Sequence, residues 1–209
     1  MFRLLVTTVF VAPLLLMPGP SSAQPASAAD GFEAGTPLEM TPNARTYGGC
    51  RFAESMSYDP VRDLYVAVNA GIAQDVIPND GYISLVNPDG TAHTLKWIGI
   101  TRNGLTLNHP LGSDIINRRL YVADIDVIRW FDMESGRPLG SITVENASRF
   151  NDIEVASDGT IYATQTGDQS SDTWKVYRVT LEGEATVFAD GPRLNRPNGV
   201  ATPTATSWW

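Results

Sequence analysis

The chain alternates between short segments of apolar, β-branched and aromatic residues and short clusters of Gly, Pro, Asn and Asp. Short apolar segments bounded by turn residues are typical of β-strands. One pattern recurs three times, as Leu64-Tyr65-Val66, Leu120-Tyr121-Val122 and Ile161-Tyr162-Ala163, and its tyrosines are 56 and then 41 residues apart. A repeat of roughly 40–50 residues built from short strands is typical of β-propeller blades.

Each repeat contains four predicted strands. They cover 51–58, 64–69, 82–87 and 93–98 in the first repeat, 112–116, 119–124, 127–132 and 141–145 in the second, and 151–156, 160–164, 174–180 and 185–189 in the third. Turn clusters separate the strands, such as Asn79-Asp80-Gly81, where glycine supplies the positive φ that tight turns need. The repeats predict three four-stranded blades, followed by the inner strand of a fourth.

Two other fold classes compete with this interpretation. A β-sandwich also has short strands with frequent turns. An α/β fold needs helices between its strands, but no apolar stripe of period 3.6 follows the N-terminal segment, and the connections are too short to hold helices. Because the strands and turns keep the same order in successive repeats, the prediction is an all-β fold, a β-propeller of four-stranded blades.

The N-terminal residues predict an exported protein. Arg3 supplies a positive charge, residues 4–17 are apolar, and Ser21-Ser22-Ala23 has the small residues that signal peptidase prefers. We therefore expect a signal peptide at 1–23, with a second candidate cut after Ala28 and an uncleaved anchor as the alternative. Residues 24–45 are predicted to be an exposed leader and 46–209 a partial propeller. The expected location is secreted or periplasmic.

Composition narrows the class of partner. The formal net charge is −8, and no run of Lys or Arg occurs in the 209 residues. Nucleic acid and anionic membrane surfaces both require a basic footprint, so neither is expected as a partner. A small-molecule substrate is expected instead, and the sequence does not indicate an oligomeric state.

Few side chains are available for redox or acid–base chemistry. The single cysteine, Cys50, excludes an intramolecular disulfide, and we expect it to be a buried small hydrophobe. The two histidines, His93 and His109, are interpreted as a strand residue and a loop residue rather than as catalytic bases. Asn146-Ala147-Ser148 is a glycosylation sequon, which is meaningful only in a eukaryotic source.

Three stretches lie at blade spacing along the chain. They are Glu54-Ser55-Met56-Ser57-Tyr58-Asp59, Arg149-Phe150-Asn151-Asp152 and Arg196-Pro197-Asn198-Gly199-Val200-Ala201. In this order they resemble the gluconolactonase, regucalcin and luciferin-regenerating-enzyme family of six-bladed propellers, from residue 51 to the C-terminus. The second stretch, followed by Asp158-Gly159-Thr160-Ile161-Tyr162-Ala163, is the closest match. The resemblance implies a six-bladed fold, of which about three and a half blades are present in this chain.

The resemblance also implies roles for particular residues. Glu54 and Asn198 would coordinate a divalent metal, and Arg149 and Asn151 would contact the substrate, with Asn151 as a candidate third ligand. Carboxylate and amide oxygens are hard ligands that suit calcium, magnesium or manganese. The expected cofactor is therefore a divalent ion, calcium first, with magnesium, manganese or zinc as alternatives.

The chain departs from the family pattern at several positions. Ser55 and Met56 follow Glu54 where the family has a small residue and proline. The family's later aspartate, a metal ligand and proposed general base, has no counterpart in this chain, and Asp124 and Asp126 lie on a different blade. No catalytic residue is therefore assigned.

Simpler structural readings compete with several of these assignments. Asn198-Gly199 is also an ordinary turn dipeptide, and Asp152 is expected to shape its strand end by accepting backbone amides. Trp97, Trp130 and Trp174 are expected to pack between blades. Glu54 alternates with the apolar Phe52 and Met56 and so should face their side, where a buried carboxylate would have to be paired or metal-bound.

Two classes of function follow from the sequence. The first is an exported, metal-dependent hydrolase of a lactone or related cyclic ester, and the alternative is a non-catalytic propeller that binds a small molecule or protein, or an inactive fragment. Blades take roughly 45 residues each, so we expect the chain to be a fragment of a longer six-bladed protein. It should then be marginally soluble and lack full hydrolase activity, and 206–209 should begin the second strand of a fourth blade.

Overall fold

The computed structural model is all-β over the residues that it describes. These residues are 37–41, 44–72, 77–99, 105–167 and 170–202, and side chains are described from residue 48 onward. These residues form one two-stranded and three four-stranded antiparallel sheets. The predicted signal peptide and the predicted second strand of a fourth blade lie outside the described residues.

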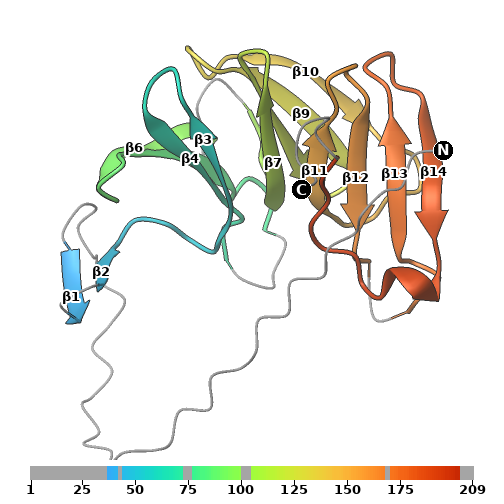
Figure 1. The fold of residues 1–209 in the computed structure, drawn as a ribbon, viewed down its shortest axis with the longest axis horizontal. Coiled ribbons are helices and arrows are strands. Elements are labelled where there is room, and N and C mark those ends of the chain that lie inside the picture. The colour runs from blue at the N-terminus through green and yellow to red at the C-terminus, as the bar shows by residue number, and fades with distance from the viewer. Residues whose placement is uncertain (1–36, 42–43, 73–76, 100–104, 168–169, 203–209) are drawn as a thin grey trace, which may run out of the picture.

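The three large sheets follow one another along the chain and are packed as propeller blades (Figure 1). Each is a meander in which consecutive strands are neighbours. Blade one contains β3 (Ala53–Asp59), β4 (Leu64–Asn69), β5 (Tyr82–Val86) and β6 (Ala92–Gly99); blade two contains β7 (Pro110–Ile116), β8 (Arg119–Asp124), β9 (Val127–Asp132) and β10 (Pro138–Thr143); blade three contains β11 (Phe150–Val155), β12 (Ile161–Gln165), β13 (Lys175–Val179) and β14 (Ala185–Asp190). The prediction of an all-β fold with three four-stranded blades is confirmed.

Several strand boundaries differ from the prediction by a few residues, and for strand β10 the structure shows the reason. Strand β10 begins at Pro138 rather than at 141, and its pairing with β9 shifts register between Pro138 and Gly140. A Cβ atom on Gly140 would lie 2.3 Å from the Trp130 ring. Glycine therefore lets the strand continue past this ring, which the alternation of apolar residues alone did not reveal.

Outside the blades the described residues contain little regular structure. Strands β1 (Pro37–Thr41) and β2 (Ala44–Tyr47) pair antiparallel at the end of the segment 24–45 that was expected to be an exposed leader, and β2 runs two residues past it. After blade three, the 3-10 helix η2 (Pro192–Leu194) is followed by a single bridge residue at Ala201. The described part of the predicted fourth blade is thus a short extended segment and not a full inner strand.

Two apolar clusters hold the three blades together. The cluster between blades one and two includes Leu120 and Val122 of β8, and the cluster between blades two and three includes Tyr121 and Ala123 of the same strand. All four side chains are buried. Because successive residues of a strand point to opposite faces, β8 supplies both clusters and is covered on both sides.

Hydroxyl groups connect the first strands of blades one and two. Ser55 Oγ donates to the Leu111 carbonyl at 2.7 Å and lies 3.0 Å from Ser113 Oγ. Ser57 Oγ donates to the Ser113 carbonyl at 3.2 Å. The serine at position 55, where the chain departs from the family pattern, therefore fixes the spacing of two neighbouring blades.

A buried carboxylate at the end of β3 joins the same two blades. Asp59 accepts a hydrogen bond from Arg62 Nε at 2.6 Å and one from the Val61 amide at 3.0 Å, and it lies 3.6 Å from Arg118 of blade two. Burial alone would raise the pKa of the Asp59 carboxyl, but these donors and charges hold its pKa below the ordinary value.

Two expectations about individual side chains can be compared with the structure. Trp97 is buried between blades one and two, where the Arg62 guanidinium lies 4.7 Å from its ring centroid, so its packing role is confirmed. Cys50 was expected to be buried, and this is wrong, because it is exposed. The reason is that β3 begins at Ala53 and leaves Cys50 ahead of the sheet. No helix among the described residues has the length and apolar character needed to cross a membrane.

We predict that Asp59→Asn lowers the free energy of unfolding at pH 7 by about 2 kcal/mol, because Arg62 loses its buried partner. Since the folded-state pKa of Asp59 is lowered, its contribution is present above about pH 4 and is lost as the pH falls through the folded pKa. Urea denaturation at pH 7 and pH 3 measures both effects. Asp158→Asn is the matched control, because this exposed turn residue bonds to the nearby Thr160 amide rather than to a neighbouring blade; an equal loss in both variants would contradict the prediction.

Candidate functional site

A cavity of about 340 Å³ lies where the first strands of the three blades begin. Each blade contributes the residue just before its first strand and the second residue of that strand. The lining residues are Phe52 and Glu54 from blade one, His109 and Leu111 from blade two, Arg149 and Asn151 from blade three, and Thr166, Gly167 and Arg196. The cavity is therefore built from equivalent positions of the repeat.

Bulges explain why these positions face the cavity. The pairing of the first two strands shifts register between Ala53 and Ser55 in blade one, between Pro110 and Ser113 in blade two, and between Phe150 and Ile153 in blade three. A bulge places an extra residue on one strand and redirects its side chain. Glu54 lies inside the first of these irregular segments and Asn151 inside the third.

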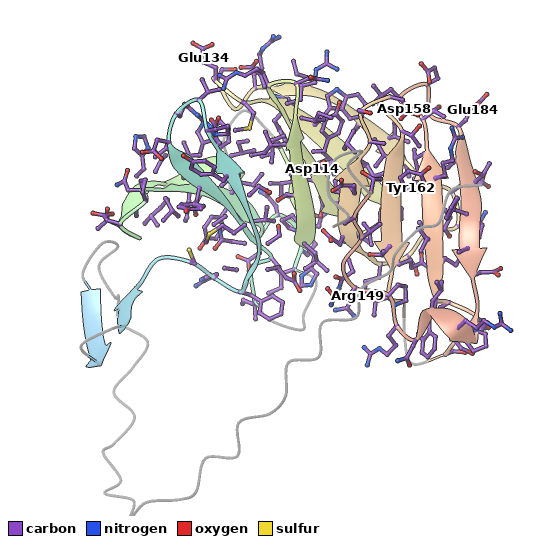
Figure 2. The ribbon with its side chains drawn as sticks, viewed as in Figure 1. Asp114, Glu134, Arg149, Asp158, Tyr162 and Glu184 are labelled. Carbon is purple, nitrogen blue, oxygen red and sulfur yellow. The ribbon has the colours of Figure 1, made fainter. Side chains whose placement is uncertain are left out.

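Arg149 and Asn151 line the cavity from blade three. Arg149 is exposed, and Asn151 is half-buried. Figure 2 shows Arg149 at the opposite edge of the sheets from the turn residues Glu134, Asp158 and Glu184. No carboxylate among the described residues makes an ion pair with Arg149, so its guanidinium is available to a ligand.

Glu54 lines the same cavity from blade one, but the expected strand alternation does not hold around it. Phe52 shares the cavity with Glu54, whereas Met56 does not line it and is 59% exposed. The register shift before Ser55 breaks the alternation between 54 and 56. Glu54 is an exposed residue, and partial burial of its carboxyl raises its pKa above the ordinary value.

Asn198 does not line the cavity, although it was expected to meet Glu54 and Asn151 there. It is exposed, and its backbone carbonyl accepts a hydrogen bond from Thr164 Oγ1 at 2.6 Å. Asn195 and Arg196 both adopt positive φ, which turns the chain so that Arg196 reaches the cavity. The third stretch of the resemblance therefore contributes an arginine to the cavity.

Asp152 fixes the segment that carries Arg196. Its Oδ2 atom accepts the Val200 amide at 3.1 Å, so the expected bonding to backbone amides is confirmed. Burial raises the pKa of Asp152 to about 6, the Val200 hydrogen bond opposes this, and the negative charge of Glu54 adds to the rise. Because Asp152 follows the lining residue Asn151 in β11, a titratable carboxyl lies beside the cavity.

His109 is a cavity residue to which the sequence analysis gave no role in the site. Asp124 Oδ1 accepts the amides of Asn108 at 3.0 Å and His109 at 2.8 Å, and Asp124 Oδ2 pairs with Arg129 Nε at 3.0 Å. The His109 ring stacks on Phe52 with centroids 6.3 Å apart. The signal was positional: Phe52, His109 and Arg149 each come just before the first strand of a blade.

The environment of His109 keeps its ring neutral. Burial lowers the pKa of the ring, and the positive charge of Arg149 lowers it further, while a backbone hydrogen bond at Ala70 and the charge of Asp124 act in the opposite direction. The His109 side chain is buried, and its Nδ1 atom has no hydrogen-bond partner among the described residues. Asp124 thus has a structural role, as it holds the backbone of this histidine.

The described side chains offer few donors for a metal ion. Within the described ranges, no group of three or more His, Cys, Asp or Glu side chains is placed to hold an ion. Glu54 and Asn151 supply one carboxylate and one amide to the cavity. This oxygen-only pair fits a hard cation that keeps several water ligands, such as calcium, and does not fit a tightly closed zinc site.

Comparisons with known proteins do not assign a family. No family model matches the chain, and no curated protein matches it. Among solved structures, it is similar to hydrazine synthase from Kuenenia stuttgartiensis, with 18% sequence identity and a TM-score of 0.44. That alignment covers 64% of this chain and 36% of the hydrazine synthase chain.

We predict that the Asp152 carboxyl titrates with a pKa of about 6 in metal-free protein, measured by carbon NMR of the side-chain carboxyl. Glu54→Gln should lower this pKa, because it removes a neighbouring negative charge. Since the folded pKa is raised, Asp152 favours the folded state below about pH 4, and this contribution is lost as the pH rises to about 6. Glu134→Gln, on the opposite edge of the sheets (Figure 2), is the control; an ordinary pKa near 4 for Asp152 would refute the assignment.

Proposed function

We propose that the protein is an exported hydrolase of a lactone or related cyclic ester that uses a divalent cation, similar to the gluconolactonase and regucalcin family. One observation carries the proposal. Glu54, Arg149 and Asn151, which the sequence stretches single out as ligand or substrate contacts, line the same cavity although blade two separates them along the chain. Lactones of sugar size suit a cavity of about 340 Å³.

The cavity's polar groups can bind and orient such a substrate. The Arg149 guanidinium is a rigid donor for ring or carbonyl oxygens, and the half-buried Asn151 amide offers both a donor and an acceptor. Phe52 and Leu111 add apolar surface to the lining. Placing the ring between these groups would fix the direction in which its ester carbonyl points.

The proposed cation would be held by Glu54 and Asn151, with water completing its shell. When bound, such an ion supplies charge that polarises a lactone carbonyl and lowers the pKa of a water molecule. Two protein oxygens make a weak site, so millimolar calcium affinity is expected.

A proton acceptor is also needed for hydrolysis. Among the described residues that line the cavity, Glu54 and His109 are the two that can accept a proton near neutral pH. The lowered pKa of His109 keeps the ring neutral at pH 7, as a base requires. The Nδ1 atom of His109 is buried away from solvent, however, so we propose the Glu54 carboxylate as the proton acceptor, in the position from which it would also hold the cation.

A non-catalytic binding protein is the second candidate. Asn198 lies outside the cavity, which leaves one carboxylate and one amide as the candidate cation ligands. A site with so few ligands could hold a small molecule without turning it over. The two candidates differ in whether a lactone is consumed.

We expect the protein to hydrolyse a lactone only when millimolar calcium is present, and Glu54→Gln and Asn151→Ala to lower the rate at least tenfold, because each removes one of two protein ligands. Ring opening releases acid and is measured in a pH-stat. Calcium should also raise the melting temperature of the wild-type protein but not of Glu54→Gln.

Glu134→Gln is the matched control for charge, because Glu134 lies on the opposite edge of the sheets (Figure 2). A calcium-independent rate, or equal rates in Glu54→Gln and Glu134→Gln, would refute the cation's role. Binding of a lactone without turnover would favour the second candidate.

A further inference from the structure

We propose that the ligand of this cavity carries a carboxylate, which pairs with Arg149 and Arg196, so that the substrate class is a monolactone of a sugar diacid. The inference deepens the proposed function and depends on it for the lactone ring only. The carboxylate pairing depends on the two arginines alone and can be tested without hydrolysis.

The first observation is that the cavity contains two arginines that no protein carboxylate neutralises. Arg51, Arg62, Arg118 and Arg129 all pair with described aspartates. Arg149 and Arg196 line the cavity, and neither makes an ion pair with a carboxylate among the described residues. Two guanidinium groups that share a cavity repel each other, and an anion between them removes that repulsion.

The second observation is the charge balance of the cavity lining. Glu54 is its only carboxylate among the described residues. His109 is neutral, because burial and the charge of Arg149 lower its pKa. The lining itself carries two guanidinium groups and one carboxylate, and Asp152, whose carboxyl interacts with Glu54, adds a second negative charge beside it once ionised. A bound calcium ion would then leave the site with an excess of positive charge.

The third observation is that Arg196 is held in place by its neighbours. Thr166 Oγ1 donates to the Pro197 carbonyl at 2.7 Å, and Thr164 Oγ1 donates to the Asn198 carbonyl at 2.6 Å. Arg196 has a φ of 61°, and Phe52, which also lines the cavity, has a φ of 48°. Non-glycine residues in this conformation carry strain, which the surrounding structure sustains most often where ligands bind.

The chemistry of the arginine side chain favours a carboxylate. A guanidinium is planar and donates two parallel hydrogen bonds that match the two oxygens of a carboxylate. A cavity of about 340 Å³ accommodates one small ring with a carboxylate substituent. In the reaction, water adds to the lactone carbonyl and the ring ester C–O bond breaks. The ring oxygen leaves as a hydroxyl, and the new carboxyl loses a proton, which gives an open-chain diacid.

The test measures binding before hydrolysis. Isothermal titration calorimetry in EDTA compares three probes: glucarate, glucaro-1,4-lactone and the neutral glucono-1,5-lactone. We expect glucarate and glucaro-1,4-lactone, the two probes that carry a carboxylate, to bind at least tenfold more tightly than the neutral lactone. Their binding should weaken as salt is added. Arg149→Gln and Arg196→Gln should each weaken carboxylate binding about tenfold, the effect of one charge-assisted hydrogen bond, and change binding of the neutral lactone less than twofold.

Arg193→Gln is the matched control, because Arg193 is exposed in η2 three residues before Arg196 and does not line the cavity. Thermal unfolding checks that each variant folds, and Arg149→Lys and Arg196→Lys, which keep the charge but lose the planar fork, give a second measurement. Equal affinities for charged and neutral probes, an equal effect of Arg193→Gln, or inorganic phosphate binding as tightly as glucarate would overturn the inference. If glucarate binds through the arginines but no lactone is hydrolysed, the carboxylate pairing stands and the proposed hydrolase activity fails.

Discussion

The rest of the structure depends on strand β8, which is buried on both faces. Leu120 and Val122 pack toward blade one, and Tyr121 and Ala123 pack toward blade three. One short strand thereby joins two apolar clusters into a single arrangement of three sheets. The first strands of the blades are held side by side only because these clusters fix the sheets behind them, so the cavity depends on residues that never touch it.

The polar bonds between blades set a finer spacing on this apolar frame. The amide of Val155 in blade three donates to Asp114 Oδ2 in blade two at 2.9 Å, and Ser55 and Ser57 bond to the Leu111 and Ser113 carbonyls. Figure 2 shows Asp114 on the first strand of the central sheet. The Ser55 bond adjoins Glu54 and is made to Leu111, so it limits how far these two lining residues can separate. Positions beside the cavity thus serve as spacers between blades.

Sequence alone predicted the sheets well because their signals are local. Alternation in Leu120-Tyr121-Val122 and turn clusters such as Ser157-Asp158-Gly159 depend on neighbouring residues, and the observed strands follow them to within a few positions. Cys50 was misplaced because its burial depends on where β3 begins, and Met56 because a register shift interrupts the alternation.

The cavity was predicted less completely, because its members come from distant parts of the chain. Glu54, Arg149 and Asn151 were visible as motifs, whereas His109 sits in no motif and its burial arises from Asp124 and Phe52. Asn198 was assigned as a ligand from the resemblance to the gluconolactonase family, which gave Arg196 no role. The positive φ at Asn195 and Arg196, which decides which side chain enters the cavity, follows from the way the segment docks on Asp152 and Thr164.

The bulges at the start of each first strand separate the residues that pack the sheets together from the residues that line the cavity. Residues behind the bulge determine whether the sheets associate, and residues at and before it determine what the cavity accepts. A substitution at 54, 109 or 149 can therefore change the ligand without disturbing the apolar clusters, and duplicated blades can diverge one at a time. The lining can therefore vary at a few positions while the packed sheets stay unchanged.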